Sequence, residues 1–87
     1  MNTVRVSGTA EIRIDFEQMA IDEIALILGD EGMKNIEVNV VRVKEPDDLP
    51  DDWFDDLDYT LSFSGEIDED LVECLRNVSE IIDVKVI

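Results

Sequence analysis

Histidine is missing from this chain of 87 residues, and cysteine occurs once, at Cys74. Without histidine, acid–base catalysis near neutral pH would need an unusual carboxyl group or a lysine. One cysteine excludes an internal disulfide and a cysteine-based zinc site. Cys74 falls on the apolar stripe of a predicted helix with acidic residues nearby, so we expect a core cysteine rather than a nucleophile. Since the sequence contains no recognisable catalytic motif either, it predicts a protein that is not an enzyme and holds no cofactor.

Basic residues are also scarce: 7 lysines and arginines stand against 23 aspartates and glutamates, for a net charge of −16. Such a chain repels phosphate groups and anionic lipids, which argues against direct binding to nucleic acid or to a membrane. The partners that suit it are cations and strongly basic protein surfaces. Because no apolar run reaches a membrane-spanning length and no basic region precedes one, we expect a cytoplasmic protein, in the host cytoplasm if a phage encodes it.

Apolar residues make up 45% of the chain, enough for one domain over residues 1–87 with a real core. Alternating apolar residues predict a long strand over residues 4–16 and further strands near residues 36–43, 59–65 and 82–86. The apolar phase slips by one residue at Val41, which indicates a β-bulge. A helix with Asp15 as N-cap and Gln18 as its capping partner is expected to end at Gly29 or Gly32.

A second helix is expected after the third strand, capped by Asp68. Its inward residues would be Leu71, Cys74, Leu75 and Val78. The resulting order, β-α-β-β-α-β, predicts an α+β domain of the ferredoxin-like type, a four-stranded antiparallel sheet with both helices on one face.

An acidic insert, residues 45–58, connects the second and third strands where a tight hairpin would suffice. It contains three aspartate doublets: Asp47, Asp48, Asp51, Asp52, Asp55 and Asp56. On a helix of about 3.6 residues per turn, these aspartates and Asp58 share one half of the wheel. Trp53 and Phe54 share the other half, either as anchors for a partner or as a pin that holds the insert to the sheet. We therefore predict a short acidic helix from Pro50 to about Leu57.

Positive and negative charges are segregated along the chain. Five bases occupy outward strand positions: Arg5, Arg13, Arg42, Lys44 and Lys85. In the first predicted helix every charged residue is acidic, Asp22 and Glu23 among them, so no base is available for an i,i+4 ion pair. The last-turn aspartates of the predicted insert helix oppose its dipole by roughly 0.3–1 kcal/mol each.

Calcium binding and adaptation to high salt could each account for an acidic chain as well. No register of the aspartate insert fits a calcium-binding EF-hand loop, which needs a central glycine and a final glutamate, so only weak binding of divalent cations is expected. Adaptation to high salt would also give an acidic surface, but three alanines against ten isoleucines is not the small-residue composition expected there.

The opening stretch, VRVSGTAEIRIDFEQMAIDEIALIL, resembles the first strand and helix of small phage-type proteins of the form VxGTAxVxVxxE. With its extreme acidity, the chain looks like small phage-encoded inhibitors that mimic nucleic acid, such as anti-CRISPR and anti-restriction proteins. These inhibitors share charge and size rather than a motif, so the resemblance transfers no functional residue. The element order is also that of ACT-like ligand-binding domains, but Asp15-Phe16 replaces the glycine-bearing turn after the first strand.

The leading hypothesis is a DNA mimic, a non-enzymatic module that blocks the basic groove of a nucleic-acid-binding protein. Its predicted contacts are the six doublet aspartates, Trp53, Phe54, Asp58, Asp22 and Glu23. The alternative is a structural or regulatory domain whose acidity serves solubility, with a homodimer formed through a sheet edge.

Overall fold

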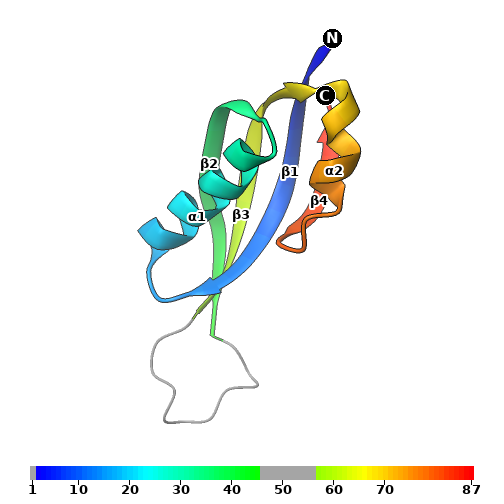
Figure 1. Ribbon diagram of the computed structural model, residues 1–87. Coiled ribbons are helices and arrows are strands. Elements are labelled where there is room, and N and C mark those ends of the chain that lie inside the picture. The colour runs from blue at the N-terminus through cyan, green and yellow to red at the C-terminus, as the bar shows by residue number, and fades with distance from the viewer. Residues whose placement is uncertain (1, 46–56) are drawn as a thin grey trace.

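The computed structural model describes residues 2–45 and 57–87. Its elements are β1 (Thr3–Ile14), α1 (Glu17–Asp30), β2 (Lys34–Lys44), β3 (Leu57–Asp68), the 3-10 turn η1 (Glu69–Leu71), α2 (Val72–Arg76) and β4 (Ile81–Val86). The strands form one antiparallel sheet in the order β2-β3-β1-β4 (Figure 1). The predicted element order and antiparallel sheet are confirmed. The helix predicted for the insert, with its aspartate doublets, Trp53 and Phe54, lies outside the described residues.

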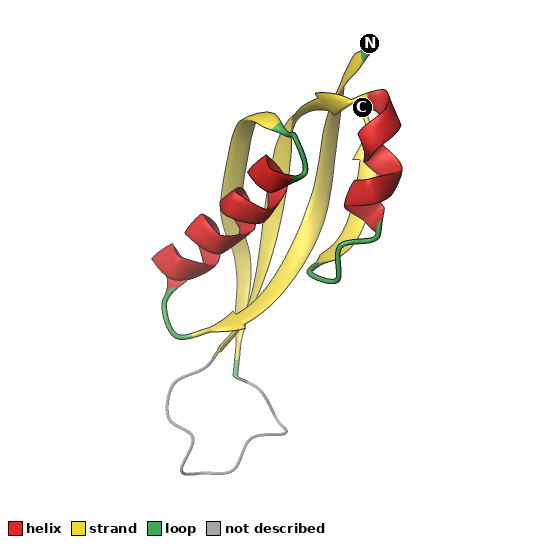
Figure 2. Cartoon of the chain, viewed as in Figure 1, coloured by secondary structure: helices red, strands yellow, loops and turns green. Residues whose placement is uncertain are grey.

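The core lies between one face of the sheet and the two helices, which both cover that face (Figure 2). Alternate residues of β3 are buried from Tyr59 to Ile67, with Leu61 fully buried. On β1, Val6 and Ala10 lie opposite Gly65 and Leu61 and point the same way. The helices complete this cluster with buried residues at helical spacing: Ala20, Ile24 and Leu28 from α1, and Val72 and Leu75 from α2.

Glycine is required at two places for different reasons. At Gly8, a Cβ atom would lie 2.1 Å from the Asp83 carbonyl oxygen and 2.6 Å from Cζ of Phe63, whose ring crosses β1 there. Gly32 has a φ of +97°. The Gly32 N–H donates to the Gly29 carbonyl and the Met33 N–H to the Leu28 carbonyl, both at 3.0 Å, so α1 ends in a Schellman motif. The predicted glycine stop is therefore confirmed.

The predicted start of α1 is wrong by one residue. Phe16, in an extended conformation with φ −126° and ψ 143°, is the N-cap, and no side chain caps the helix there. Gln18 does not form a capping box; its amide donates to Asp22 Oδ1 at 3.0 Å, one turn further on. By contrast, Asp68 is a cap as predicted, since its Oδ1 accepts from the Asp70 N–H at 3.0 Å, but it caps the 3-10 turn η1 rather than α2, whose N-cap is Leu71.

The second helix departs from the expected ferredoxin-like form because it is short and follows β3 directly through η1. The 3-10 turn shifts the helical register of α2, so Val72 and Leu75 point into the core. Leu71 is 36% exposed, and Cys74 is exposed as well. The prediction of a core cysteine is therefore wrong.

Both outer strands are interrupted by bulges. On β2, the register shifts between Lys34 and Glu37 and again between Val40 and Arg42, where Val41 is the extra residue and is 66% exposed. The bulge predicted from the apolar slip is thus confirmed. On β4, the register shifts opposite Thr9 and Ala10, which leaves Ile82 outside the ladder. Bulges of this kind hinder the edge-to-edge pairing of sheets.

Candidate interaction surfaces

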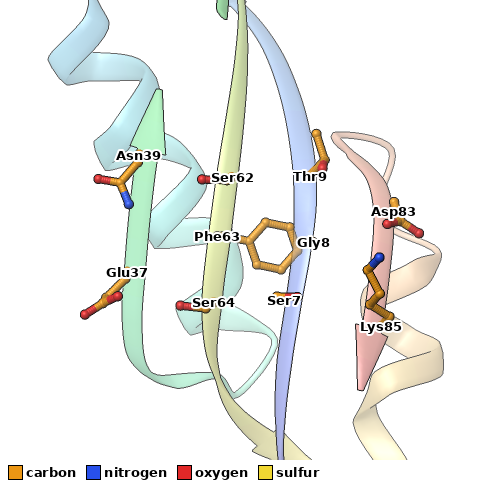
Figure 3. Close-up of a pocket in the computed structure, with 10 residues that line it drawn as sticks. All are labelled: Ser7, Gly8, Thr9, Glu37, Asn39, Ser62, Phe63, Ser64, Asp83 and Lys85. Carbon is orange, nitrogen blue, oxygen red and sulfur yellow. The ribbon is translucent and has the colours of Figure 1, made fainter. Parts of the chain in front are cut away.

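The sheet face away from the helices is open and is built from rows of side chains that run across the strands. The strand register places these residues side by side. One central row is Glu37, Ser64, Ser7 and Lys85. The next is Asn39, Ser62, Thr9 and Asp83. Short hydroxyl side chains thus occupy the middle of both rows, while the longer charged and amide groups stand on the outer strands β2 and β4 (Figure 3).

These two central rows line an open hollow of about 360 Å³. Its serine and threonine side chains are partly buried, because each is flanked by neighbours on both adjacent strands. Figure 3 shows the Phe63 ring beside Gly8 within the same group of residues. The hollow can accept a polar group or a second surface, and it has no exposed aromatic side chain among its lining residues.

Three further rows carry charge and flank the central ones. They are Lys34, Glu66 and Arg5 at one end, and Arg42, Thr60 and Glu11, then Lys44, Asp58 and Arg13, at the other. Arg13 Nε donates to Asp58 Oδ1 at 2.8 Å, and Arg5 Nη1 lies 3.8 Å from Glu66 Oε1. The five rows, which we call the open sheet face, contain six basic and five acidic residues. Its charge is therefore nearly balanced.

The opposite surface has a different composition. Its acids, which together we call the acidic helix side, are Glu17, Asp22, Glu23, Asp30, Glu31, Glu69, Asp70 and Glu73. The one base among these elements is Arg76, whose Nη1 donates to Glu73 Oε1 at 2.6 Å. Within the described part of the chain, α1 takes part in no ion pair. Six of the seven basic residues therefore lie on the open sheet face, and the acids of α1 face solvent without a neutralising partner.

The predicted contact residues fall into two groups. Asp22 and Glu23 are exposed on α1, beside the other acids of the helix side. Asp58 lies on the open sheet face instead, in its ion pair with Arg13, so it does not join them. The structure describes none of the other predicted contacts, which lie at residues 47–56.

Sequence reasoning missed the open sheet face as a surface. The alternation of Ser7, Thr9, Ser62 and Ser64 with apolar residues is visible in each strand. Which of these residues lie side by side depends on the pairing register of the strands, and no single segment of the sequence specifies that register.

Within residues 2–45 and 57–87, no three acidic or cysteine side chains gather closely enough to hold a metal ion. Across those residues there is also no helix with the length and apolar character that a membrane crossing requires.

Comparison with known proteins adds no relative: the sequence matches no protein-family model and no curated protein. What this protein does must therefore be inferred from its own charges and geometry.

Proposed function

We propose that the protein is a non-enzymatic interaction module whose acidic helix side mimics nucleic acid and binds the basic surface of a nucleic-acid-binding protein. One observation carries the proposal: eight acids share the helix side with a single base, while six of the seven bases lie on the other face of the sheet. Acidity that served only solubility would not require this segregation. The arrangement concentrates the negative field on one side of the molecule.

The spacing of the acids on α1 supports the same proposal. Glu23 and Asp30 are seven residues apart and lie on nearly the same side of the helix, roughly 10 Å from each other at 1.5 Å of rise per residue. On one strand of DNA, phosphates advance by about 3.4 Å of helix axis, so this distance spans roughly three steps. A protein whose basic residues are spaced to bind the phosphates of one DNA strand can therefore bind Glu23 and Asp30 with those same residues.

The absence of ion pairs on α1 matters energetically. A carboxylate in an ion pair would have to lose its basic partner before it could bind a basic surface, whereas Asp22 and Glu23 are in no ion pair and Asp22 accepts only from the neutral Gln18 amide. Opposite charges also accelerate association by steering, and both the rate and the affinity then fall as salt rises. The insert aspartates, Trp53 and Phe54 remain predicted additions to this surface. The ion pair to Arg13 makes Asp58 the weakest of the predicted contacts.

The ferredoxin-like class is likewise a proposal for the fold, supported by the element order and the position of both helices on one face. The five-residue α2, which follows β3 directly, is its departure from a pair of full-length helices.

The test uses two variants that each remove three negative charges, for a net charge of −13 from −16. The helix-side variant is Asp22→Asn, Glu23→Gln and Asp30→Asn. The matched sheet-face variant is Glu11→Gln, Glu37→Gln and Asp83→Asn. The wild-type protein, immobilised at low salt, is used to select basic proteins from a host extract. Each purified protein is then bound to a short DNA duplex in competition with the wild type and both variants.

We expect wild-type protein to displace the duplex from at least one captured protein, and salt to weaken that binding. The helix-side variant should compete at least tenfold less well, whereas the sheet-face variant should compete like wild type. Equal weakening by both variants would show that only net charge matters. That result would overturn the proposal. So would a wild-type protein that displaces DNA from none of the captured proteins.

A further inference from the structure

We propose that the open sheet face binds a second copy of this chain, face to face, about a two-fold axis that runs along the strands between β1 and β3. This dimer does not depend on the proposed function, since it concerns the opposite surface. It rests on the order of charges across the rows, which becomes self-complementary under that one symmetry operation.

The central rows show the complementarity most clearly. Under this axis, β2 of one copy lies over β4 of the other, and each row meets its own equivalent in reverse order. Glu37 then faces Lys85 of the second copy, and Asn39 faces Asp83. Symmetry generates each contact twice. The hydroxyl residues in the middle of the rows, Ser7 and Ser64 among them, face one another.

Two of the three outer rows obey the same rule, because in each of them β3 carries the acid and β1 the base, whereas in the third row Glu11 meets Thr60 of the second copy. Glu66 meets Arg5 of the second copy, and Asp58 meets Arg13. Since each copy already pairs these residues internally, both sites become clusters of two arginines and two carboxylates. Networks of this kind contribute more than isolated surface pairs. Nowhere in these five rows does the operation place one charge directly over another of the same sign.

A two-fold axis that runs across the strands gives the opposite result. It would place Lys34 over Lys44, Arg5 over Arg13 and Glu66 over Asp58. One favourable pair, Glu37 with Arg42, would not offset three sets of like charges, each present twice by symmetry. Charge complementarity therefore selects one of the two face-to-face arrangements.

The shape of the face also suits a second sheet. Stacked sheets lie about 10 Å apart, and the short serine and threonine side chains of the hollow permit that approach. The charged groups at the rim are long enough to span the gap. Two rows across four strands and three rows across three strands cover roughly 550 Å² on each copy at ordinary strand spacings, so the total falls at the lower limit for specific interfaces. We therefore expect a weak and wet interface, with water between the hydroxyl groups.

Repulsion between the net charges of the two copies opposes the dimer, and salt reduces it. Each copy carries −16, but the helix-side acids stand behind the sheet, on the surface away from the partner. Salt at about 0.15 M screens interactions beyond roughly 8 Å, so it removes most of the repulsion between the two helix sides. The dimer should consequently strengthen as salt rises from a low value, whereas binding to a basic target should weaken.

A homodimer through a sheet edge, as the sequence suggested, suits the structure less well. Both outer strands are bulged, at Val41 and at Ile82, so neither offers a regular ladder to a second copy. The open face contains no such interruption between the rows of β1 and β3, whose register is continuous from Thr3 to Ile14.

A charge-swap experiment tests the proposal, with association measured by sedimentation equilibrium over a range of protein concentrations. The single variants are Glu37→Lys and Lys85→Glu, and the double variant combines them and keeps the wild-type net charge. Within one copy, Glu37 and Lys85 are separated by three strand spacings, roughly 14 Å, so they do not contact each other. Rescue in the double variant can therefore arise only between copies.

At moderate salt we expect wild-type dimers, at least tenfold weaker association in both single variants, and recovery to within threefold of wild type in the double variant. Replacing Ser64 by Trp should abolish association because the ring would hold the faces apart. The helix-side variant should dimerise at least as well as wild type. A chain that stays monomeric at every salt concentration, or a double variant that is no better than the singles, would overturn the proposal. A folded spectrum of each variant by circular dichroism excludes misfolding as the cause.

Discussion

The acidic helix side and the open sheet face are built on the two sides of one sheet, yet they distribute charge in opposite ways. On the open face, the strand register brings each of Arg5 and Arg13 beside an acid of β3, so the charges cancel locally. On α1, acids recur without a base one turn away, so their fields add. Neighbouring strands can neutralise each other because they belong to one surface, whereas α1 carries no base that could neutralise its acids.

The two proposals predict opposite responses to salt. The proposed complex of the helix side with a basic protein should lose attraction as salt screens it, while the proposed contact between two open faces should gain because the repulsion between whole molecules falls. One titration with sodium chloride therefore separates the two proposals, and neither result can be mistaken for the other. Substitutions on each side of the sheet then show how much each face contributes to the stability of the fold.

The largest effect is expected from two adjacent residues of β3 that point to opposite faces. Leu61 is fully buried under the helices, so Leu61→Ala should lower the free energy of unfolding by about 2–5 kcal/mol. Ser62 lies on the open face, in the hollow, so Ser62→Ala should change it by less than about 0.5 kcal/mol. Urea denaturation followed by circular dichroism measures both. Similar losses for the two variants would mean that the open face is itself buried, for example in a permanent dimer.

The next comparison concerns two aspartates at helix ends, Asp68 at the start of η1 and Asp30 at the end of α1. Asp68 caps η1 through its bond to the Asp70 N–H, so Asp68→Ala should destabilise the fold by about 1 kcal/mol. Asp30 is the last residue of α1, where negative charge opposes the helix dipole and no base is present. Asp30→Asn should therefore stabilise the fold by roughly 0.3–1 kcal/mol at low salt.

Thermal unfolding at two salt concentrations distinguishes these causes. The gain from Asp30→Asn should shrink as salt rises, because it is electrostatic, while the loss from Asp68→Ala should persist, because it removes a hydrogen bond. If Asp30→Asn lowered stability instead, the Asp30 carboxylate of the wild-type protein would have a structural role. It would then be a poorer candidate for binding a partner.

Local sequence patterns predict most of the helices and strands of this molecule and several of their ends. Strict alternation over residues 4–16 identifies β1, the apolar slip at Val41 identifies a bulge, and Gly32 and Asp68 mark a helix end and a helix start. Each of these signals lies within a few residues of the feature it predicts. The element order follows from them, because six short elements leave few arrangements for one sheet with two helices.

The errors and omissions concern features that depend on distant residues or on a change of helix type. Cys74 would face the core only if a regular α-helix began directly after Asp68. The 3-10 turn η1 comes first and shifts the helical register, so Val72 and Leu75 face the core instead. Asp58 belongs with the insert aspartates by sequence alone, although β3 begins at Leu57 and carries it to the open face beside Arg13. The rows of the open face depend on pairings between residues that are from 14 positions apart (Lys44 with Asp58) to 78 positions apart (Ser7 with Lys85), which no single segment reveals.

The smallest effect is expected from the two ion pairs of the open face, and it tests whether balance there stabilises the monomer. Arg13 and Asp58 are 2.8 Å apart, with side chains 39% and 21% exposed, whereas Arg5 and Glu66 are 3.8 Å apart at 55% and 40%. In double-mutant cycles with alanine, measured on dilute monomer, the first pair should show a coupling of about 0.5–1 kcal/mol and the second close to zero. Appreciable coupling in the second pair would indicate that Arg5 and Glu66 are held more rigidly than their exposure implies. If both pairs couple weakly in the monomer but strongly under dimerising conditions, the balanced charges of this face act mainly between copies, as the two-fold arrangement requires.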